Sequence, residues 1–97
     1  MRVAIHPSAE NDVSEAASFY RQQGSPLIAS RFVNEFRRIV ELIAAYPELG
    51  APRVRGLRGR AMAIFPYTFV YRQDNTEIRV LVVKHDRRPP GFGAGRI

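Results

Sequence analysis

The chain contains no cysteine, and this absence excludes several kinds of chemistry before any motif is considered. Without thiols the protein can form no disulfide framework, no thiolate zinc site and no cysteine nucleophile. The absence agrees with a reducing compartment, so we expect a cytoplasmic location. The two histidines lie far apart and have no acids at ligand spacing, so the sequence predicts no metal site and no cofactor.

Long apolar runs are missing as well. The only apolar stretch near the N-terminus, residues 3–5, is followed at once by Pro7, so neither a signal peptide nor a membrane span is predicted. The sequence also has no internal repeat, no linker and no low-complexity tract. We therefore expect one domain over residues 1–97, with a loose C-terminal tail from about residue 89, where proline and glycine are frequent.

Acidic residues are scarce in the second half of the chain. Residues 1–48 hold five arginines and six acids, a net charge of −1, whereas residues 49–97 hold ten basic residues and three acids, a net charge of +7. Fourteen of the fifteen basic residues are arginine, whose planar guanidinium binds phosphate and carboxylate groups through two parallel hydrogen bonds. The sequence therefore predicts that the C-terminal half contacts an anionic partner.

The spacing of apolar residues predicts two helices joined by a short turn. The first helix is expected to begin at Ser8 as N-cap and to end at Gly24 in a left-handed conformation. The second is expected to have Ser25 as N-cap and Pro26 at its first position, and to end at Tyr46. Helices joined so tightly form an antiparallel hairpin. The faces predicted to be buried are Val13, Ala16, Ala17 and Tyr20 in the first helix and Ile28, Phe32, Phe36, Ile39, Val40 and Ile43 in the second.

The remaining sequence is rich in strand-forming residues. Residues 48–59 are expected to form a connecting loop, and three β-rich runs follow at residues 60–65, 67–72 and 78–85. The last run is mostly apolar, so we place it in the middle of the sheet with both faces covered. The predicted fold class is α+β: an N-terminal strand, a two-helix antiparallel hairpin and a three-stranded antiparallel meander, packed as a two-layer sandwich.

Several short motifs occur along this predicted fold in a fixed order. They are Pro7-x-Ala9-x-x-Asp12, Phe32 on the second helix, Pro47-Glu48-Leu49-Gly50, Gly56-Leu57-Arg58, Phe65-Pro66-Tyr67, Val70-Tyr71-Arg72 and His85-x-Arg87-Arg88-x-Pro90. The ordered set resembles the RelE/ParE family of toxins from type II toxin–antitoxin systems, over nearly the whole chain. The resemblance implies a small toxin that is neutralised by an antitoxin encoded beside it, in a hetero-oligomeric complex.

The resemblance leaves two targets open. RelE-like and YoeB-like members cut mRNA on the ribosome, whereas ParE-like members poison DNA gyrase. Cleavage of RNA through its 2′-hydroxyl needs a base, an acid and cations around the phosphate. His85 is a candidate acid or base, and Glu48 approximately matches the carboxylate that YoeB-like toxins use as base. The candidate cations are Arg58, Arg72, Arg87 and Arg88.

Three departures from the ribonuclease pattern favour the gyrase-directed branch. Thr68 stands where the ribonuclease branch usually carries an arginine. RelE-like members carry lysines at two alternate positions of the preceding strand, and the nearest matches here are Arg60 and Met62, so this pair is at best half present. Where such members carry Tyr or His near the C-terminus, this chain has Phe92, which has no hydroxyl. We therefore expect a gyrase poison without its own bond-breaking chemistry. The alternatives that stay open are a ribosome-dependent mRNA endoribonuclease and a non-toxic basic binding module.

Each candidate residue also has an ordinary structural interpretation. His85 is expected to bond a loop at the end of a strand, His6 to be structural or exposed, and the aromatic face of residues 67–71 to be core rather than a platform for bases. The arginines of the 53–60 loop are either solvated or used to pair with acidic antitoxin residues. The predicted residues for antitoxin or target binding are Arg53, Arg55, Arg58, Arg60, Arg87 and Arg88.

Overall fold

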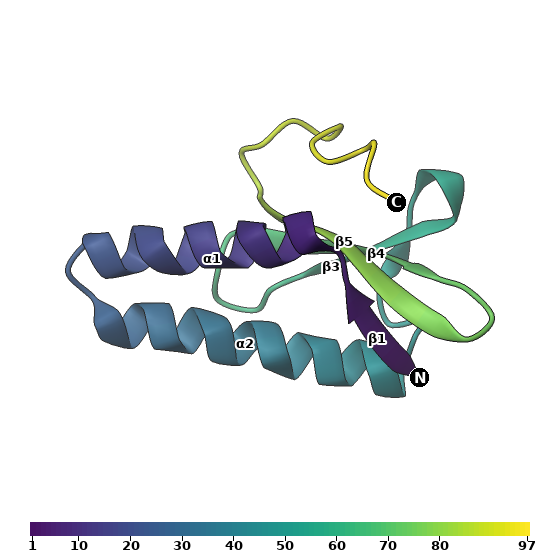
Figure 1. The fold of residues 1–97 in the computed structure, drawn as a ribbon, viewed down its shortest axis with the longest axis horizontal. Helices are drawn as coiled ribbons and strands as arrows, with labels where there is room; N and C mark the ends of the chain where they lie inside the picture. The colour runs from purple at the N-terminus through teal and green to yellow at the C-terminus, as the bar shows by residue number, and fades with distance from the viewer.

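The computed structural model describes all 97 residues and has two helices packed on a five-stranded sheet (Figure 1). The strand order in the sheet is β1-β5-β4-β3-β2. The elements are β1 (Arg2–Ile5), α1 (Pro7–Gln22), α2 (Pro26–Ala45), β2 (Ala51–Pro52), the short 3₁₀ turn η1 (Val54–Gly56), β3 (Leu57–Ala61), β4 (Tyr67–Gln73) and β5 (Glu77–His85). The predicted α+β class, the helical hairpin and the antiparallel β3-β4-β5 meander are confirmed.

The helix ends follow local hydrogen bonding. The predicted N-cap Ser8 is wrong, because Pro7 already occupies the first turn and His6 Nδ1 accepts a hydrogen bond from the Ser8 N–H at 3.0 Å. The prediction for the second helix is confirmed, since Ser25 Oγ accepts from the Ile28 N–H at 3.2 Å. Gly24 lies just beyond α1 with φ +85°, the left-handed conformation that lets the chain reverse into α2.

The first strand of the meander begins earlier than predicted. It covers Leu57–Ala61 rather than residues 60–65, and the two-residue strand β2 pairs with it inside the segment that was expected to be a loop. The glycines and arginines of this segment have little strand preference of their own. Its conformation is fixed by pairing with β4, in which Arg58 lies opposite Tyr71 and Leu57 opposite Arg72.

The main core lies between the helices and one face of the sheet, which we call the inner face. Alternate residues of β4 point into it, so the aromatic residues of this strand are buried, as predicted. Phe32 of α2 contacts the Tyr67 ring edge-on at 4.9 Å between centroids, and Phe36 stacks on Phe69 at 5.3 Å. The helix faces predicted to be buried all contribute to this packing except Ala17, which is buried outside this cluster.

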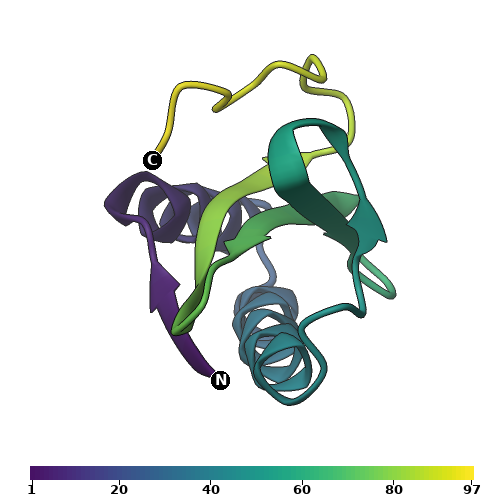
Figure 2. The ribbon, with the colours of Figure 1, turned by 90° about the vertical axis from the view of Figure 1, so that its right-hand side faces the viewer.

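The opposite, outer face of the sheet is covered by the C-terminal segment (Figure 2). A β-bulge makes this possible: Val70 pairs with Val82 but Tyr71 pairs with Val80, so Leu81 is an extra residue in β5. Leu81 and Val82 therefore both join Val70 in a small outer cluster, against which Phe92 packs. The tail thus folds back over the sheet. The strand β5 lies inside the sheet between β1 and β4, and both of its faces are covered, as expected. Neither helix is long and apolar enough to cross a membrane.

Candidate functional site

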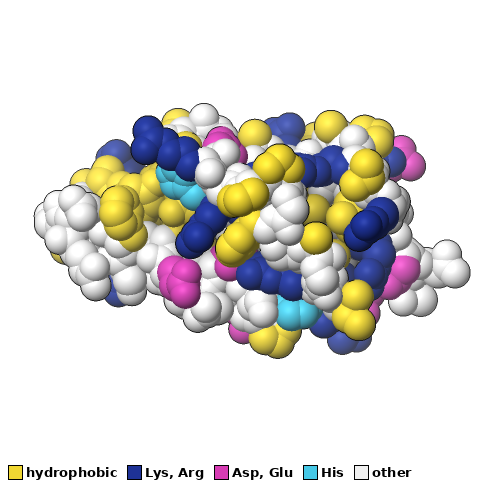
Figure 3. All heavy atoms as spheres, turned by 90° about the horizontal axis from the view of Figure 1, so that it is seen from above, with side chains coloured by type: hydrophobic (Ala, Val, Ile, Leu, Met, Phe, Trp, Pro, Cys, Tyr) yellow, Lys and Arg dark blue, Asp and Glu magenta, His cyan; other side chains and the backbone are white.

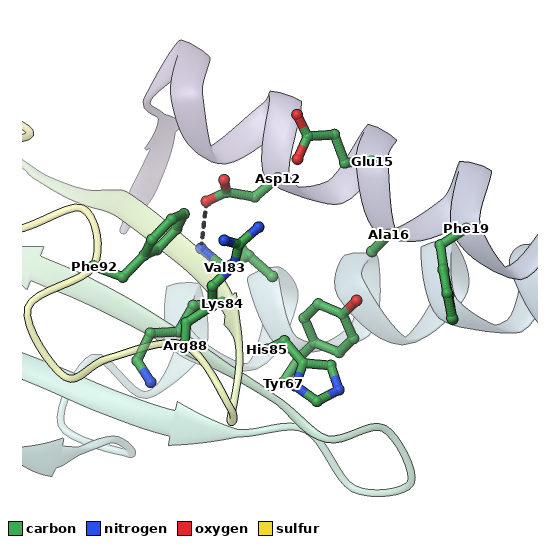
Figure 4. A pocket seen from close by; sticks show the side chains of 10 residues that line it. All are labelled: Asp12, Glu15, Ala16, Phe19, Tyr67, Val83, Lys84, His85, Arg88 and Phe92. Carbon is green, nitrogen blue, oxygen red and sulfur yellow. Dashed lines mark hydrogen bonds between the residues drawn. The ribbon is translucent and has the colours of Figure 1, made fainter.

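A cleft lies where β5 extends beyond its neighbour β1 (Figure 4). The pairing of β1 with β5 ends with Ile5 opposite Val80, so the edge of β5 has no strand partner from Leu81 onward. Side chains replace the missing strand, because Asp12 of α1 accepts a hydrogen bond from the Val83 N–H at 3.0 Å. The backbone edge is therefore closed by polar side chains instead of being left open to another chain.

Arg96 completes this arrangement from the C-terminal tail. Its Nη1 donates to Asp12 Oδ2 at 2.6 Å and to the Leu81 carbonyl at 3.0 Å, and its Nη2 donates to Asp12 Oδ1 at 3.2 Å. The two side chains are only 17% and 8% exposed, and the fork geometry is the one that guanidinium and carboxylate groups prefer. The guanidinium also lies over the Phe92 ring, as does that of Arg88. The pair joins α1, β5 and the tail.

The cleft encloses about 250 Å³ and carries both signs of charge. Its residues come from α1, from the start of β4, from the end of β5 and from the tail, as Figure 4 shows. They are Asp12, Glu15, Ala16, Phe19, Tyr67, Val83, Lys84, His85, Arg88 and Phe92. Asp12 is already paired with Arg96, so the other charged side chains in the cleft are Glu15, the buried Lys84, and Arg88, whose guanidinium lies over the Phe92 ring.

His85 lies in this cleft but is tied to the local backbone. Its Nδ1 accepts a hydrogen bond from the Arg87 N–H at 3.1 Å, and its ring meets the Tyr67 ring edge-on at 5.1 Å. The bond to Nδ1 leaves the proton of the neutral imidazole on Nε2. Burial raises the pKa of Tyr67, the Tyr20 side chain raises it further, and the Arg88 charge lowers it. Tyr67 therefore stays a neutral phenol at physiological pH and is not a general base.

The other predicted catalytic residues are divided between the two faces of the sheet. Arg58 lies opposite Tyr71 in the β3–β4 ladder and so shares the inner face, where its Nη1 donates to the Gly50 carbonyl at 2.9 Å and to the Glu48 carbonyl at 3.4 Å. Arg72 lies opposite Leu57 and points to the outer face. Arg87 is exposed in the turn after β5. The structure therefore brings His85 and Arg88 together, but Arg58 and Arg72 lie on opposite faces of the sheet.

The four arginines predicted as one binding loop are divided in the same way. Arg53 and Arg55 flank a groove on the outer face, whereas Arg60 lies opposite Phe69 on the inner face. The Nε of Arg60 is buried without a hydrogen-bond partner, and the guanidinium contributes to holding the pKa of Glu35 below its ordinary value, after the dominant hydrogen bond from Arg38. The loop is therefore two separate basic surfaces rather than one.

Sequence reasoning missed the roles of two polar residues. In the sequence Asp12 is one residue of a motif, but in the structure it binds both the β5 edge and Arg96. The sequence predicts Tyr71 as a core residue, and in the structure its hydroxyl also accepts from the Gly50 N–H and donates to the Pro47 carbonyl, both at 2.8 Å. The partners lie 84 and 71 residues from Asp12, and 21 and 24 residues from Tyr71, so no local pattern reveals them.

Comparison with known proteins gives the family. The chain resembles a solved structure described as the chromosomal ParDE TA system from P. aeruginosa, with 22% sequence identity, a TM-score of 0.78, and coverage of 88% of this chain and 95% of that chain. No curated protein matches the chain. The family described as ParE toxin of type II toxin-antitoxin system, parDE, matches residues 3–90. Since this match covers most of the chain, the protein belongs to the ParE toxin family of type II toxin–antitoxin systems.

Proposed function

We propose that this toxin inhibits growth by poisoning DNA gyrase and that a cognate antitoxin neutralises it by direct binding. Membership of the ParE family is the observation that carries the proposal. On this view the protein acts by binding a macromolecular target, and its arginines recognise that target rather than cleave a bond.

The arrangement of the candidate catalytic residues supports binding over RNA cleavage. Thr68, at the position where the ribonuclease branch usually has an arginine, donates its hydroxyl to Asp86 Oδ1 at 2.8 Å, so a neutral hydrogen-bonded side chain occupies this place. Arg58 and Arg72 lie on opposite faces of the sheet and cannot surround one phosphate group. Stabilising a pentacoordinate phosphate needs its cations in a single cluster.

A gyrase assay tests the proposal. Purified toxin is added to gyrase, ATP and supercoiled plasmid, and the reaction is stopped with detergent. We expect linear DNA to accumulate through trapped cleavage complexes, and prior addition of the antitoxin encoded beside the toxin gene to prevent it. Absence of any effect on gyrase at saturating toxin would contradict the proposed target.

The ribonuclease alternative has a matched test in the same protein. If the protein acts by binding gyrase through other residues, the variants His85→Ala and Arg87→Ala are expected to retain toxicity. If His85 takes part in proton transfer and Arg87 in phosphate binding, both variants should lose it. Growth arrest in cells lacking the antitoxin is the measurement, with circular dichroism to confirm that the variants fold. Codon-biased cuts in translated mRNA that disappear in both variants would establish the alternative.

A further inference from the structure

The outer face of the sheet carries a second hollow, larger than the cleft beside β5. This outer groove encloses about 490 Å³ between the C-terminal tail and the η1 turn, within the size range of ligand-binding pockets. Its floor includes Leu57, Val70 and Leu81, and its rim includes Arg53, Arg55 and Arg72. Basic and hydrophobic side chains lie side by side on the face of the molecule that carries the tail (Figure 3).

The charged side chains of the outer groove are of one sign only. Four arginines line it and no acidic residue does. The structure has two ion pairs, Glu35–Arg38 and Asp12–Arg96, so Arg53, Arg55 and Arg72 form no ion pair within this chain, although, after the dominant backbone hydrogen bonds, the charge of Arg72 contributes to lowering the pKa of Asp74. Three unpaired guanidinium groups around an apolar floor are complementary to a ligand that carries both carboxylates and an apolar side chain.

The backbone of the η1 turn supports a binding role for this rim. Arg55 is the one non-glycine residue of the chain with positive φ, at φ +61° and ψ +31°, and Gly56 follows with φ +72°. This turn leaves the Val54 side chain 77% exposed beside the groove. An exposed apolar side chain next to a strained, unpaired arginine gains contacts when a partner covers both.

The lining favours a protein segment over a nucleic acid. The floor is aliphatic, and the one aromatic ring in the groove, Phe92, has the guanidinium groups of Arg88 and Arg96 at 4.8 and 5.2 Å from its centroid, so it is already engaged by cations. Arginine is the only polar residue type among the lining residues, so there is no amide or hydroxyl side chain for recognition of base edges.

We propose that the outer groove binds a segment of an acidic partner protein in which an apolar side chain, seated on the floor, is flanked by carboxylates that pair with Arg53, Arg55 and Arg72. The inference deepens the proposed function and rests on it for the identity of the partner, because a neutralising antitoxin is the protein partner that function requires. The chemistry of the groove itself is independent of the target of the toxin.

Peptide display on the immobilised full-length protein tests the groove without any antitoxin. We expect the enriched peptides to carry at least two acids beside Leu, Ile or Phe. Their affinity should fall about tenfold or more for the double variant Arg55→Gln/Arg72→Gln, which corresponds to roughly 1.4 kcal/mol. Neither arginine forms an ion pair within the chain, so the variant is expected to keep the fold, which circular dichroism checks.

The control is Arg31→Gln/Arg37→Gln on the exposed face of α2, which removes the same net charge far from the groove and should leave affinity unchanged. No enrichment, enrichment of acid-free peptides, or equal losses in both double variants would overturn the inference. A single-stranded DNA of about ten nucleotides is the competitor for the nucleic-acid possibility. If it displaces the peptides and binds more tightly than they do, the groove is a nucleic-acid surface instead.

The antitoxin encoded beside the toxin gene is then titrated against both double variants. Weaker binding to Arg55→Gln/Arg72→Gln alone supports the groove as the antitoxin site. Equal binding to both double variants overturns it, even if gyrase poisoning is established. Conversely, if gyrase is unaffected while the acidic peptides still depend on Arg55 and Arg72, the groove stands and the proposed target fails.

Discussion

Single side chains in this protein form hydrogen bonds with loop backbone groups. The Tyr71 ring is fully buried on the inner face, but its hydroxyl reaches the loop that follows α2 and satisfies the Gly50 N–H and the Pro47 carbonyl. Gly50 is required there because an added Cβ would lie 2.8 Å from that hydroxyl oxygen. Arg58 holds the same loop through the Gly50 carbonyl, so an arginine that the sequence offered as catalytic has a structural bond.

Tyr71→Phe should therefore destabilise the protein although it removes one atom. The change leaves a buried N–H and a carbonyl without a partner, and the free energy of unfolding should fall by about 1–3 kcal/mol. Urea denaturation followed by circular dichroism measures this. Tyr46→Phe is the matched control, because the Tyr46 side chain is 64% exposed and should be neutral. Equal stability of Tyr71→Phe and the wild type would show that water replaces the hydroxyl at no cost.

At the scale of elements, the C-terminal tail packs on the outer face of the sheet. Phe92 covers the outer cluster created by the β5 bulge, and Arg96 reaches across to α1. Because β1 stops at Ile5, the tail and Asp12 complete the edge of β5 that a longer first strand would have paired. The tail thus shapes both the cleft beside β5 and the outer groove, each of which it lines.

The docking of the tail depends on Gly93. This residue has φ +76°, and an added Cβ would lie 2.6 Å from Val82 Cγ2, so Gly93→Ala combines backbone strain with a clash. We expect a loss of roughly 1–2 kcal/mol in stability. Gly95→Ala, whose Cβ meets no atom within 4 Å, is the control and should not destabilise. Hydrogen exchange at the Val83 amide should accelerate in Gly93→Ala only; protection equal to that of Gly95→Ala would refute the role of the tail.

At the scale of the whole molecule, positive charge is distributed unevenly over the surface. The net charge is +6, and the positive excess comes from the sheet and the tail, whereas the helical hairpin is nearly balanced. Only two of the fifteen basic residues form ion pairs, so most of this charge is available for long-range attraction of an acidic partner.

The rate at which an acidic antitoxin associates should consequently depend on salt. Between about 0.05 M and about 0.5 M NaCl we expect the association rate constant to fall on the order of tenfold, because counter-ions screen the steering field. The dissociation rate constant should change less, since it reflects contacts already made. Stopped-flow measurements separate the two. An association rate that is independent of salt would mean that the basic faces do not guide the encounter.

The sequence by itself determined the elements that depend on local chemistry: the helical hairpin from its apolar spacing and the Ser25 cap, the meander from its β-rich runs, and the family from its ordered motifs. It failed for the first meander strand, whose glycines and arginines have no strand preference of their own. Only the tertiary structure decided that Arg58 and Arg72 face apart, that Asp12 meets Arg96, and that the tail covers the sheet. These outcomes depend on strand register, on a bulge and on contacts between residues up to 84 positions apart, which local patterns do not encode.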